Sequence, residues 1–466
     1  MSFDSIGFLT CFLPMLALLH TLLRSVRARN VLLLAAGLIF YAFGSLSGLA
    51  LLLACAAVNY GFGLLLLRTR RRAKPIAAAA VILDLAFLAV FKYLDFALSV
   101  LFPASALRIG LAAPVGSSFF TFRCISYIVD TARDRENGTR SFFEALLYIS
   151  FFPQLMAGPI ARFRAFRPQL ADRPREAEQA AAGLRRFLVG LSKKLLLAGT
   201  AAKIADGVFA AGAAPDARLA WLGAAAYTLQ IYMDFSGYSD MAIGLGRMFG
   251  FVSPENFNYP YAAGTITEFW RRWHISLSSW FRDYVYIPLG GSRKGRGRAA
   301  LNKMIVFLLC GLWHGAGWTF LLWGLWHGVL SALETLLVRK TPKSPRGGAL
   351  RRVLGHVYVL LAVCVGFVFF RAETLADGWR VLRAMLGAVP ASTASTVALH
   401  TLLTPLSAAL LLISAVAALP VRRCFASFGA TAPGKALSYA ACLLLLVLCI
   451  AELAAGGFSP FIYFRF

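Results

Sequence analysis

Long apolar segments separated by short basic clusters constrain this chain more than any other feature of its sequence. Residues 31–41, 49–67, 76–90 and 436–451 each carry one charge or none. A helix needs roughly 20 mostly apolar residues to cross the hydrocarbon core of a bilayer. About a dozen stretches approach this pattern, although some are too short to span alone. The sequence therefore predicts an all-α polytopic membrane protein whose helices lie in the lipid bilayer.

The composition of the 466 residues excludes two other classes of protein. Apolar residues make up 59% of the chain and charged residues only 15%. Soluble domains are nearer half apolar and a quarter charged, which makes a cytosolic enzyme a poor fit. Disordered chains have low hydrophobicity, the reverse of this composition.

The chain is strongly basic, with 47 Lys and Arg against 21 Asp and Glu and a net charge of +26. In a soluble protein this excess would indicate nucleic-acid binding. Here the cations lie in clusters between apolar segments, for example at residues 24–29 and 68–74. Cytoplasmic loops of membrane proteins have this bias, so we place both clusters in the cytoplasm and expect no nucleic-acid partner.

The pattern along the chain predicts one integral membrane domain, residues 1–466, in three parts. Residues 1–102 form an N-terminal helical block and residues 353–466 a set of ordinary C-terminal helices. Between them, residues 114–335 have shorter apolar stretches broken by Gly, Pro and polar residues. Interrupted backbone at membrane depth is tolerated only when it is buried in protein or lines a watery cavity, so we expect the function to lie in this core.

Two of the six histidines occur in a repeated pentapeptide, Gly-Leu-Trp-His-Gly, at residues 311–315 and 324–328. If one helix ran through both copies, His314 and His327 would lie about 20 Å apart and on different faces. They could not then serve the same reacting atom. An ionisable group at membrane depth is costly and indicates function, but a neutral histidine bonded to a neighbouring helix is the alternative for each.

His314 is the stronger candidate because an apolar segment leads into it and two glycines follow it closely. Trp313 and Trp318 are candidates for the walls of a pocket that excludes water. His327 is expected to pack or to line this pocket.

Residues 268–284 form a second constellation, which we expect to be one amphipathic helix lying at the membrane interface. An aromatic and apolar stripe follows from the helical spacing of Trp270, Trp273, Leu277 and Trp280. The functional alternative adds that His274, with Arg271 or Arg272, meets an anionic or polar substrate. The two interpretations are compatible.

Three other segments supply candidate binding residues. Arg293 and Lys294 lie in a Gly-rich basic loop that could hold a phosphorylated donor, although a simple cytoplasmic loop is favoured. Asp234 and Asp240 lie in an apolar segment that Gly237 is expected to break, and they fit structural anchors better than a catalytic pair. Gln154 lies among the prolines of a predicted re-entrant turn.

The sequence lacks a cysteine cluster, the His-Glu-x-x-His pattern and a Gly-x-Ser-x-Gly elbow, so no metal site is predicted. A histidine acting as general base on a hydroxyl is the chemistry that remains.

Together, Phe-Trp-Arg-Arg-Trp-His at residues 269–274 and Leu-Trp-His-Gly at residues 312–315 resemble the signature of the membrane-bound O-acyltransferase family. The similarity covers most of the chain and points to the bacterial branch, which acylates exported polymers such as alginate, peptidoglycan and teichoic acid. The chain departs from the family pattern at residues 121–123, where Thr-Phe-Arg stands in place of Thr-Phe-Gln.

The resemblance implies about 11 transmembrane helices, with re-entrant and interfacial helices, around a central tunnel. It implies that His314 and His274 are both catalytic. His274, the second signature histidine, would orient an acyl carbonyl or assist proton transfer. It also implies a bacterial inner-membrane enzyme that takes an acetyl group from acetyl-CoA, a donor substrate, with no bound cofactor. The acceptor would be a polysaccharide, served by an SGNH-hydrolase-like partner outside the cytoplasm.

Two alternatives remain at this stage. A transporter of a polymer or lipid-linked precursor would also have broken helices and intramembrane Asp residues, but we find no internal inverted repeat. A non-catalytic scaffold for a periplasmic acetyltransferase would tolerate histidine substitutions.

Overall fold

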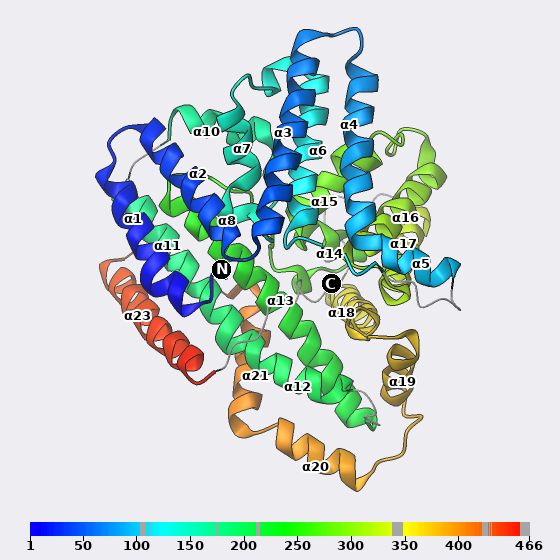
Figure 1. Ribbon diagram of the computed structural model, residues 1–466. Helices are drawn as coiled ribbons and strands as arrows, with labels where there is room; N and C mark the ends of the chain where they lie inside the picture. Colours follow the sequence, from blue (N-terminus) through cyan, green and yellow to red (C-terminus); the bar gives the residue numbers. More distant parts are fainter. Residues whose placement is uncertain are drawn as a thin grey trace. The chain divides into compact units, whose positions relative to one another are not determined.

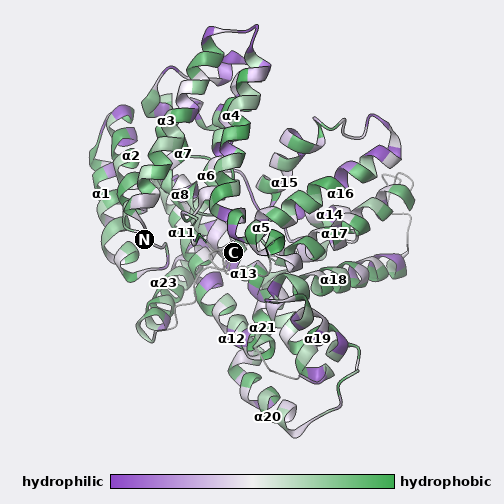
Figure 2. Ribbon diagram, turned by 45° about the vertical axis from the view of Figure 1, so that its right-hand side comes forward, coloured by the Kyte–Doolittle hydropathy of each residue, from purple (hydrophilic) through white to green (hydrophobic). Residues whose placement is uncertain are grey.

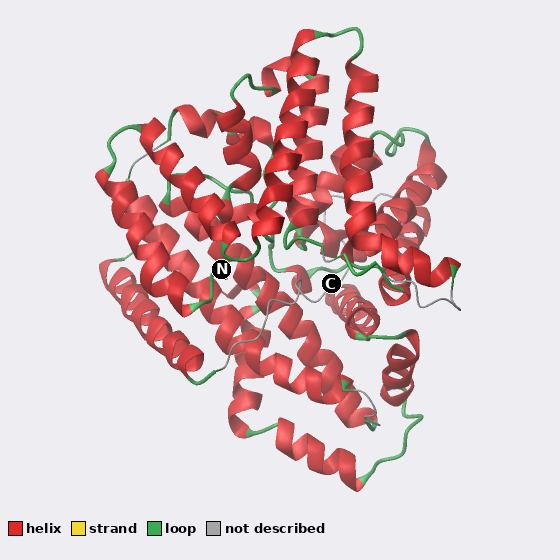
Figure 3. Cartoon of the chain, in the orientation of Figure 1, coloured by secondary structure: helices red, strands yellow, loops and turns green. Residues whose placement is uncertain are grey.

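The computed structural model describes residues 1–102, 109–111, 113–173, 176–210, 215–337, 348–421, 427, 429 and 431–456. Within these ranges every regular element is a helix, and no strand occurs (Figure 3). The prediction of an all-α chain is confirmed.

The chain divides into two compact units, which are described separately. Unit 1 comprises residues 1–187 and 239–254, and unit 2 comprises residues 188–238 and 255–466. The chain passes from one unit to the other three times, inside the helices α11 (Ala177–Ser192) and α13 (Ala217–Met248) and between residues 254 and 255, outside any helix.

The other elements of unit 1 are η1 (Phe8–Phe12), α1 (Leu13–Leu22), α2 (Val26–Ala42), α3 (Leu46–Arg68), α4 (Ala73–Leu88), η2 (Ala89–Tyr93), α5 (Leu94–Leu101), α6 (Ser117–Arg133), η3 (Arg135–Asn137), α7 (Phe142–Ser150), α8 (Phe152–Leu155), α9 (Phe163–Phe166) and α10 (Pro168–Ala171).

The other elements of unit 2 are η4 (Lys193–Ala198), α12 (Gly199–Phe209), η5 (Pro260–Ala262), α14 (Ile266–Arg272), α15 (Ile275–Phe281), η6 (Arg282–Tyr286), α16 (Gly295–His314), α17 (Trp318–Leu337), α18 (Ala349–Arg371), α19 (Leu375–Met385), α20 (Thr393–Leu402), α21 (Pro405–Ala417) and α23 (Ala432–Ala454).

Five helical segments of the described chain are long and apolar enough to cross a membrane. They are Leu46–Arg68, Ala73–Leu101, Trp318–Leu337, Ala349–Arg371 and Ala432–Ala454. The pair α20 and α21, bent by 70°, adds a sixth if it forms one span. Figure 2 shows the hydrophilic positions at turns, such as the one between α3 and α4, while the helices themselves are mostly hydrophobic. The multi-pass character is therefore supported, and the count of about 11 stays a prediction.

In unit 1, helix α6 packs against both α3 and α4 (Figure 1). Its contact with α3 is close: a Cβ at Gly63 would overlap the ring of Tyr127. Arg123 of α6, the departure from the family pattern, is fully buried, and its guanidinium lies 4.4 Å from the centroid of the Tyr148 ring.

In unit 2, helices α16 and α17 form a hairpin (Figure 1), and Gly311 and Gly324 face each other closely across it. A Cβ added at Gly311 would lie 3.3 Å from the Cα of Gly324, and a Cβ at Gly324 would lie 3.3 Å from the Cα of Gly311. These are the first residues of the two repeated pentapeptides. The hypothetical single helix through both copies is therefore wrong, because the chain turns at residues 315–317 between them.

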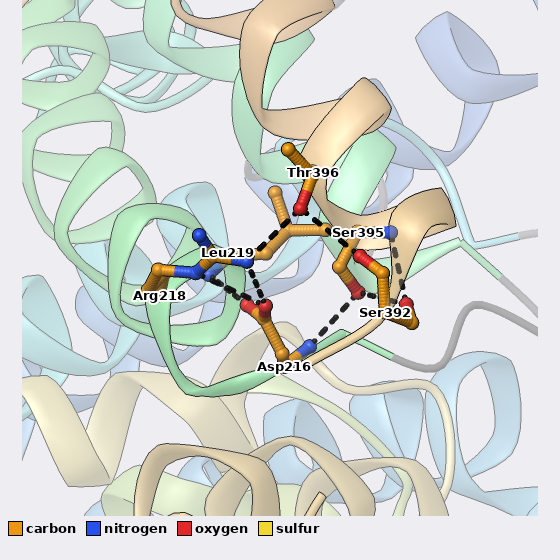
Figure 4. A network of polar contacts seen from close by, with 6 residues as sticks. All are labelled: Asp216, Arg218, Leu219, Ser392, Ser395 and Thr396. Atoms are coloured by element: carbon orange, nitrogen blue, oxygen red, sulfur yellow. Dashed lines mark hydrogen bonds and ion pairs between the residues drawn. The ribbon is translucent and has the colours of Figure 1, made fainter. Parts of the chain in front are cut away.

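In unit 2, a network of polar contacts joins the start of α13 to the start of α20 (Figure 4). Asp216 caps α13 by accepting a hydrogen bond from the backbone N–H of Leu219, 3.1 Å away, and its carboxylate pairs with Arg218 at 2.7 Å. The backbone N–H of Asp216 donates to Ser395 of α20, and Arg218 donates to Thr396. Hydrogen bonding by Arg218 lowers the pKa of Asp216 below its ordinary value.

We predict that Gly324→Ala destabilises the protein by about 1–3 kcal/mol, because the added methyl group forces α17 away from α16. Thermal unfolding in detergent measures the change. Gly297→Ala, near the start of α16 with no atom within 4 Å of the added Cβ, is the control and should unfold at the wild-type temperature or slightly above it, because Ala favours the helix. Equal unfolding of the two variants would contradict the close packing described here.

The capping network predicts a pH dependence. Because the folded state holds the pKa of Asp216 below its unfolded value of about 3.9, the carboxylate stabilises the protein above that pH and the contribution disappears as the pH falls through the lowered folded pKa. Asp216→Asn keeps a capping side chain but should lower the melting temperature at pH 7 and lose less stability than the wild type on acidification. The exposed Asp172→Asn is the control; a pH profile of Asp216→Asn that parallels the wild type would exclude this role.

Candidate active site

Helix α14, which contributes Trp270 and both arginines of the signature, is anchored by a carboxylate from α17. Glu334 accepts hydrogen bonds from the backbone N–H groups of Ile266 and Thr267 at 2.6 and 2.8 Å. The side chain of Thr265 accepts a third, from Glu268, at 3.0 Å. The first N–H groups of a helix have no intrahelical partner, so these contacts fix the start of α14 against the α16–α17 hairpin.

His274 interrupts the segment that was expected to be one amphipathic helix. Its backbone is left-handed, with φ 43° and ψ 54°, and it separates α14 from α15. The single helix over residues 268–284 is therefore wrong. The break is held by Asn256, whose backbone carbonyl accepts from the N–H of Ile275 at 2.9 Å and whose side chain accepts from Ser276.

The same amide oxygen fixes the imidazole of His274. Asn256 Oδ1 already accepts the N–H and the hydroxyl of Ser276, so His274 Nδ1, 3.0 Å away, is its third donor. Burial also lowers the pKa of His274, which favours the neutral ring. A neutral ring with the proton on Nδ1 leaves a lone pair on Nε2. Nε2 is buried and has no hydrogen-bond partner among the described residues, so it can accept a hydrogen bond.

His314 ends α16, and Gly315 follows it in an extended conformation. Its ring is 5% exposed and lies edge-on to three aromatic rings. The ring centroids of Trp313, Trp323 and Phe370 are 4.8, 5.0 and 5.0 Å from that of His314. We call these three rings the aromatic box; they limit the access of water to the imidazole.

The two signature histidines lie against the same indole. The Trp313 centroid is 4.8 Å from His314 and 6.1 Å from His274. His274 also contacts Phe235, with ring centroids 4.6 Å apart. Two buried imidazoles thus share one aromatic partner although 40 residues separate them in the sequence.

The remaining predicted residues of unit 2 lie in several environments. Trp318, at the start of α17, is 56% exposed, and it is Trp323 that contacts His314. Arg271 is exposed, whereas Arg272 pairs with Glu268 at 2.6 Å. Arg293 and Lys294 are exposed in the turn before α16, where glycines at 290, 291 and 295 have positive φ. Their roles stay predictions.

The three predicted binding residues Asp234, Asp240 and Gln154 all form ion pairs or hydrogen bonds with other side chains. Asp234 forms a buried ion pair with Lys194 of η4 at 2.8 Å in unit 2. In unit 1, Asp240 pairs with Arg186 at 2.9 Å and Gln154 donates to Ser253 at 2.8 Å. The expected break at Gly237 is wrong, since α13 is continuous through both carboxylates.

Sequence reasoning missed Asn256, Trp323 and Phe370. Asn256 comes in a segment without helical periodicity, and no local pattern links it to a histidine 18 residues later. Trp323 comes one residue before the second pentapeptide, a signal that could have been noticed. Phe370 lies in an ordinary apolar span, where only packing distinguishes it. The described residues contain no group of three or more His, Cys, Asp or Glu that could hold a metal ion.

Comparison with known proteins identifies a family and several relatives of this chain. The family model of the membrane-bound O-acyltransferases matches residues 115–375, which include both signature histidines. A protein of Azotobacter vinelandii named as a probable alginate O-acetylase is 39% identical, and the alignment covers 100% of both chains. One with the same name from Pseudomonas aeruginosa is 42% identical over 83% of this chain and 75% of its own. The peptidoglycan O-acetyltransferase of Helicobacter pylori is 33% identical over 83% of this chain and 80% of its own.

We predict that Asn256→Ala releases the imidazole of His274 from one tautomer. The variant leaves His274 Nδ1 and the N–H and hydroxyl of Ser276 without their acceptor, and each buried donor left without one costs about 1–3 kcal/mol of stability. Nitrogen NMR of the labelled ring should show Nδ1 protonated in the wild type and a tautomer mixture in the variant. Ser276→Ala, which retains the acceptor for His274, should keep the wild-type spectrum; a shared change in both variants would contradict the assignment.

Proposed function

The chain belongs to the membrane-bound O-acyltransferase family and is an O-acyltransferase, and from this premise we propose that it O-acetylates an exported polysaccharide. The donor in this proposal is acetyl-CoA on the cytoplasmic side of the bacterial inner membrane. The acceptor is a hydroxyl reached from the outer side. The names of the relatives, alginate O-acetylase and peptidoglycan O-acetyltransferase, support the polysaccharide class.

The observation that carries the mechanism is the buried imidazole of His314 inside the aromatic box. In the proposed reaction this ring takes the proton of the acceptor hydroxyl as the oxygen attacks the thioester carbonyl. The bond between carbon and sulfur then breaks, the new ester bond remains, and the imidazolium returns its proton to the leaving thiolate. Water would intercept the thioester, so a site closed by three aromatic rings favours transfer over hydrolysis.

The geometry of His274 favours one of its two predicted roles. Orienting an acyl carbonyl requires a donor hydrogen on Nε2, but Asn256 holds the proton on Nδ1. A lone pair on Nε2 instead accepts a hydrogen bond or a proton. We therefore assign His274 to proton transfer, as a partner of His314.

Charge supports the proposed direction of donor entry. The turn before α16 and the first turns of that helix expose Arg293, Lys294, Arg296 and Arg298. Clusters of this kind face the cytoplasm and attract the phosphates of coenzyme A. Transfer of the acetyl group to an SGNH-hydrolase-like partner outside the cytoplasm, which then modifies the polymer, is the part of the proposal that rests on resemblance alone.

The test measures acetyl transfer. His314→Ala should lower the acetylation of the exported polymer by about 100- to 10,000-fold, because the general base is removed. His400→Ala, the same substitution at an exposed position on α20, is the control and should retain wild-type acetylation. Both proteins must reach the wild-type level in the membrane. Full acetylation by His314→Ala would refute the role of this ring, and full acetylation in a strain lacking the protein would refute the proposed function.

A further inference from the structure

Two buried oxygen atoms of unit 1 have no hydrogen-bond partner among the described residues. They are Oδ2 of Asp84 on α4 and Oδ1 of Asn59 on α3. Asp84 is 5% exposed and Asn59 is 1% exposed, and both lie in segments long and apolar enough to cross a membrane. A carboxyl group at such a position is costly, and buried polar atoms nearly always have partners, so the two exceptions need an explanation.

The two side chains already share one hydrogen bond. Asn59 Nδ2 donates to Asp84 Oδ1 at 2.8 Å and to the backbone carbonyl of Cys55 at 3.0 Å. Because a backbone carbonyl can only accept, the second bond fixes which end of the amide is the nitrogen. Both hydrogens of the amide are therefore used, and its oxygen is left as an acceptor without a donor.

No cation neutralises Asp84 within the described residues. The titratable groups that act on it from the neighbouring helices are the thiols of Cys55 on α3 and Cys124 on α6. Lys92 of η2 comes eight residues, about 12 Å, further along the same span. The guanidinium of Arg123 on α6 lies over an aromatic ring of α7, at 4.4 Å. An ionised Asp84 would thus be a buried charge with a single donor, the amide of α3.

A proton on Asp84 Oδ2 removes both exceptions at once. An ionised carboxylate and an amide oxygen only accept hydrogen bonds, so they cannot bond to each other. A protonated carboxyl group donates, and Asn59 Oδ1 is an acceptor in need of a donor. Because each group carries its two polar atoms on one carbon, the bond already present aligns the other two for a second bond.

We infer that Asp84 is a proton-binding site, which at neutral pH carries a proton on Oδ2 and forms with Asn59 a closed acid–amide pair that joins α3 to α4. Helix α6 packs against both of these helices, so the pair lies where three helices meet (Figure 1). Loss of the proton leaves a buried charge beside an amide oxygen and loosens this contact. The inference concerns unit 1 alone and does not depend on the proposed function.

Infrared spectroscopy of the full-length protein in detergent at pH 7 tests for the proton, because a protonated carboxyl group has a C=O stretching band distinct from that of a carboxylate. The difference spectrum between the wild type and Asp84→Asn should contain this band. Asn59→Leu, which removes the acceptor, should move the band to higher frequency. Asp172→Asn, at an exposed position of the same unit, is the control and should keep the wild-type band.

A difference spectrum without the band would show that Asp84 is ionised, and this would overturn the inference. A band that stays at its wild-type frequency in Asn59→Leu would overturn the pair.

Reversible unfolding in mixed detergent micelles gives a second readout. The folded state keeps the proton, whereas the unfolded chain releases it above its pKa of about 3.9, so the stability that the pair contributes is complete below that pH and is lost as the pH rises. The unfolding constant of the wild type, divided by that of Asp84→Asn, should therefore rise about tenfold per pH unit between about pH 5 and 7.

A ratio that stays constant over this range would overturn the inference. So would an Asp84→Asn protein that does not fold, because the amide has nearly the shape of the acid and can form the same two bonds with Asn59.

Discussion

The contact between Gly311 and Gly324 is the constraint on which the site depends. Without side chains at these positions the backbones of α16 and α17 approach closely enough for a Cβ on one helix to reach the Cα of the other. Small residues serve this purpose at helix contacts in membranes, where apolar burial between helices supplies little driving force. The approach brings His314 of one helix to within ring contact of Trp323 on the other. A wider spacing would open the aromatic box to water.

The second constraint is the hydrogen bonding of an interrupted backbone. A break between α14 and α15 exposes polar groups that a continuous helix would satisfy internally. Glu334 satisfies the start of α14, and Asn256 satisfies His274 and the two residues that follow it. The same oxygen that supports the break also selects the tautomer of the imidazole. The hydrogen bonds of Asn256 therefore both support the break in the helix and fix the protonated nitrogen of His274.

Local patterns in the sequence were sufficient for the helical class and for apolar spans such as α3 and α18. They also identified His314 and His274 as candidates, whose catalytic roles stay predictions. They failed where a distant partner decides the backbone. The left-handed residue at His274 depends on Asn256, 18 positions earlier. Gly237, expected to break α13, instead lets the carbonyl of Gly190 approach, at 2.6 Å from an added Cβ. Periodicity reports neither event, because it records the faces of a helix and not what packs against them.

The course of α16 suits the proposed reaction, in which one helix serves both a charged donor and a step that excludes water. Its first residues are exposed and cationic, Lys303 is half-buried, and the side chain of His314 is 5% exposed. A phosphate at the deep end would lose its hydration without compensation, and a thioester at the shallow end would meet water. Because polarity falls along about 30 Å of helix, each part of a long donor meets the surroundings that suit it. In the proposed reaction, the separation of binding charge from reacting carbon is thus a property of the helix itself.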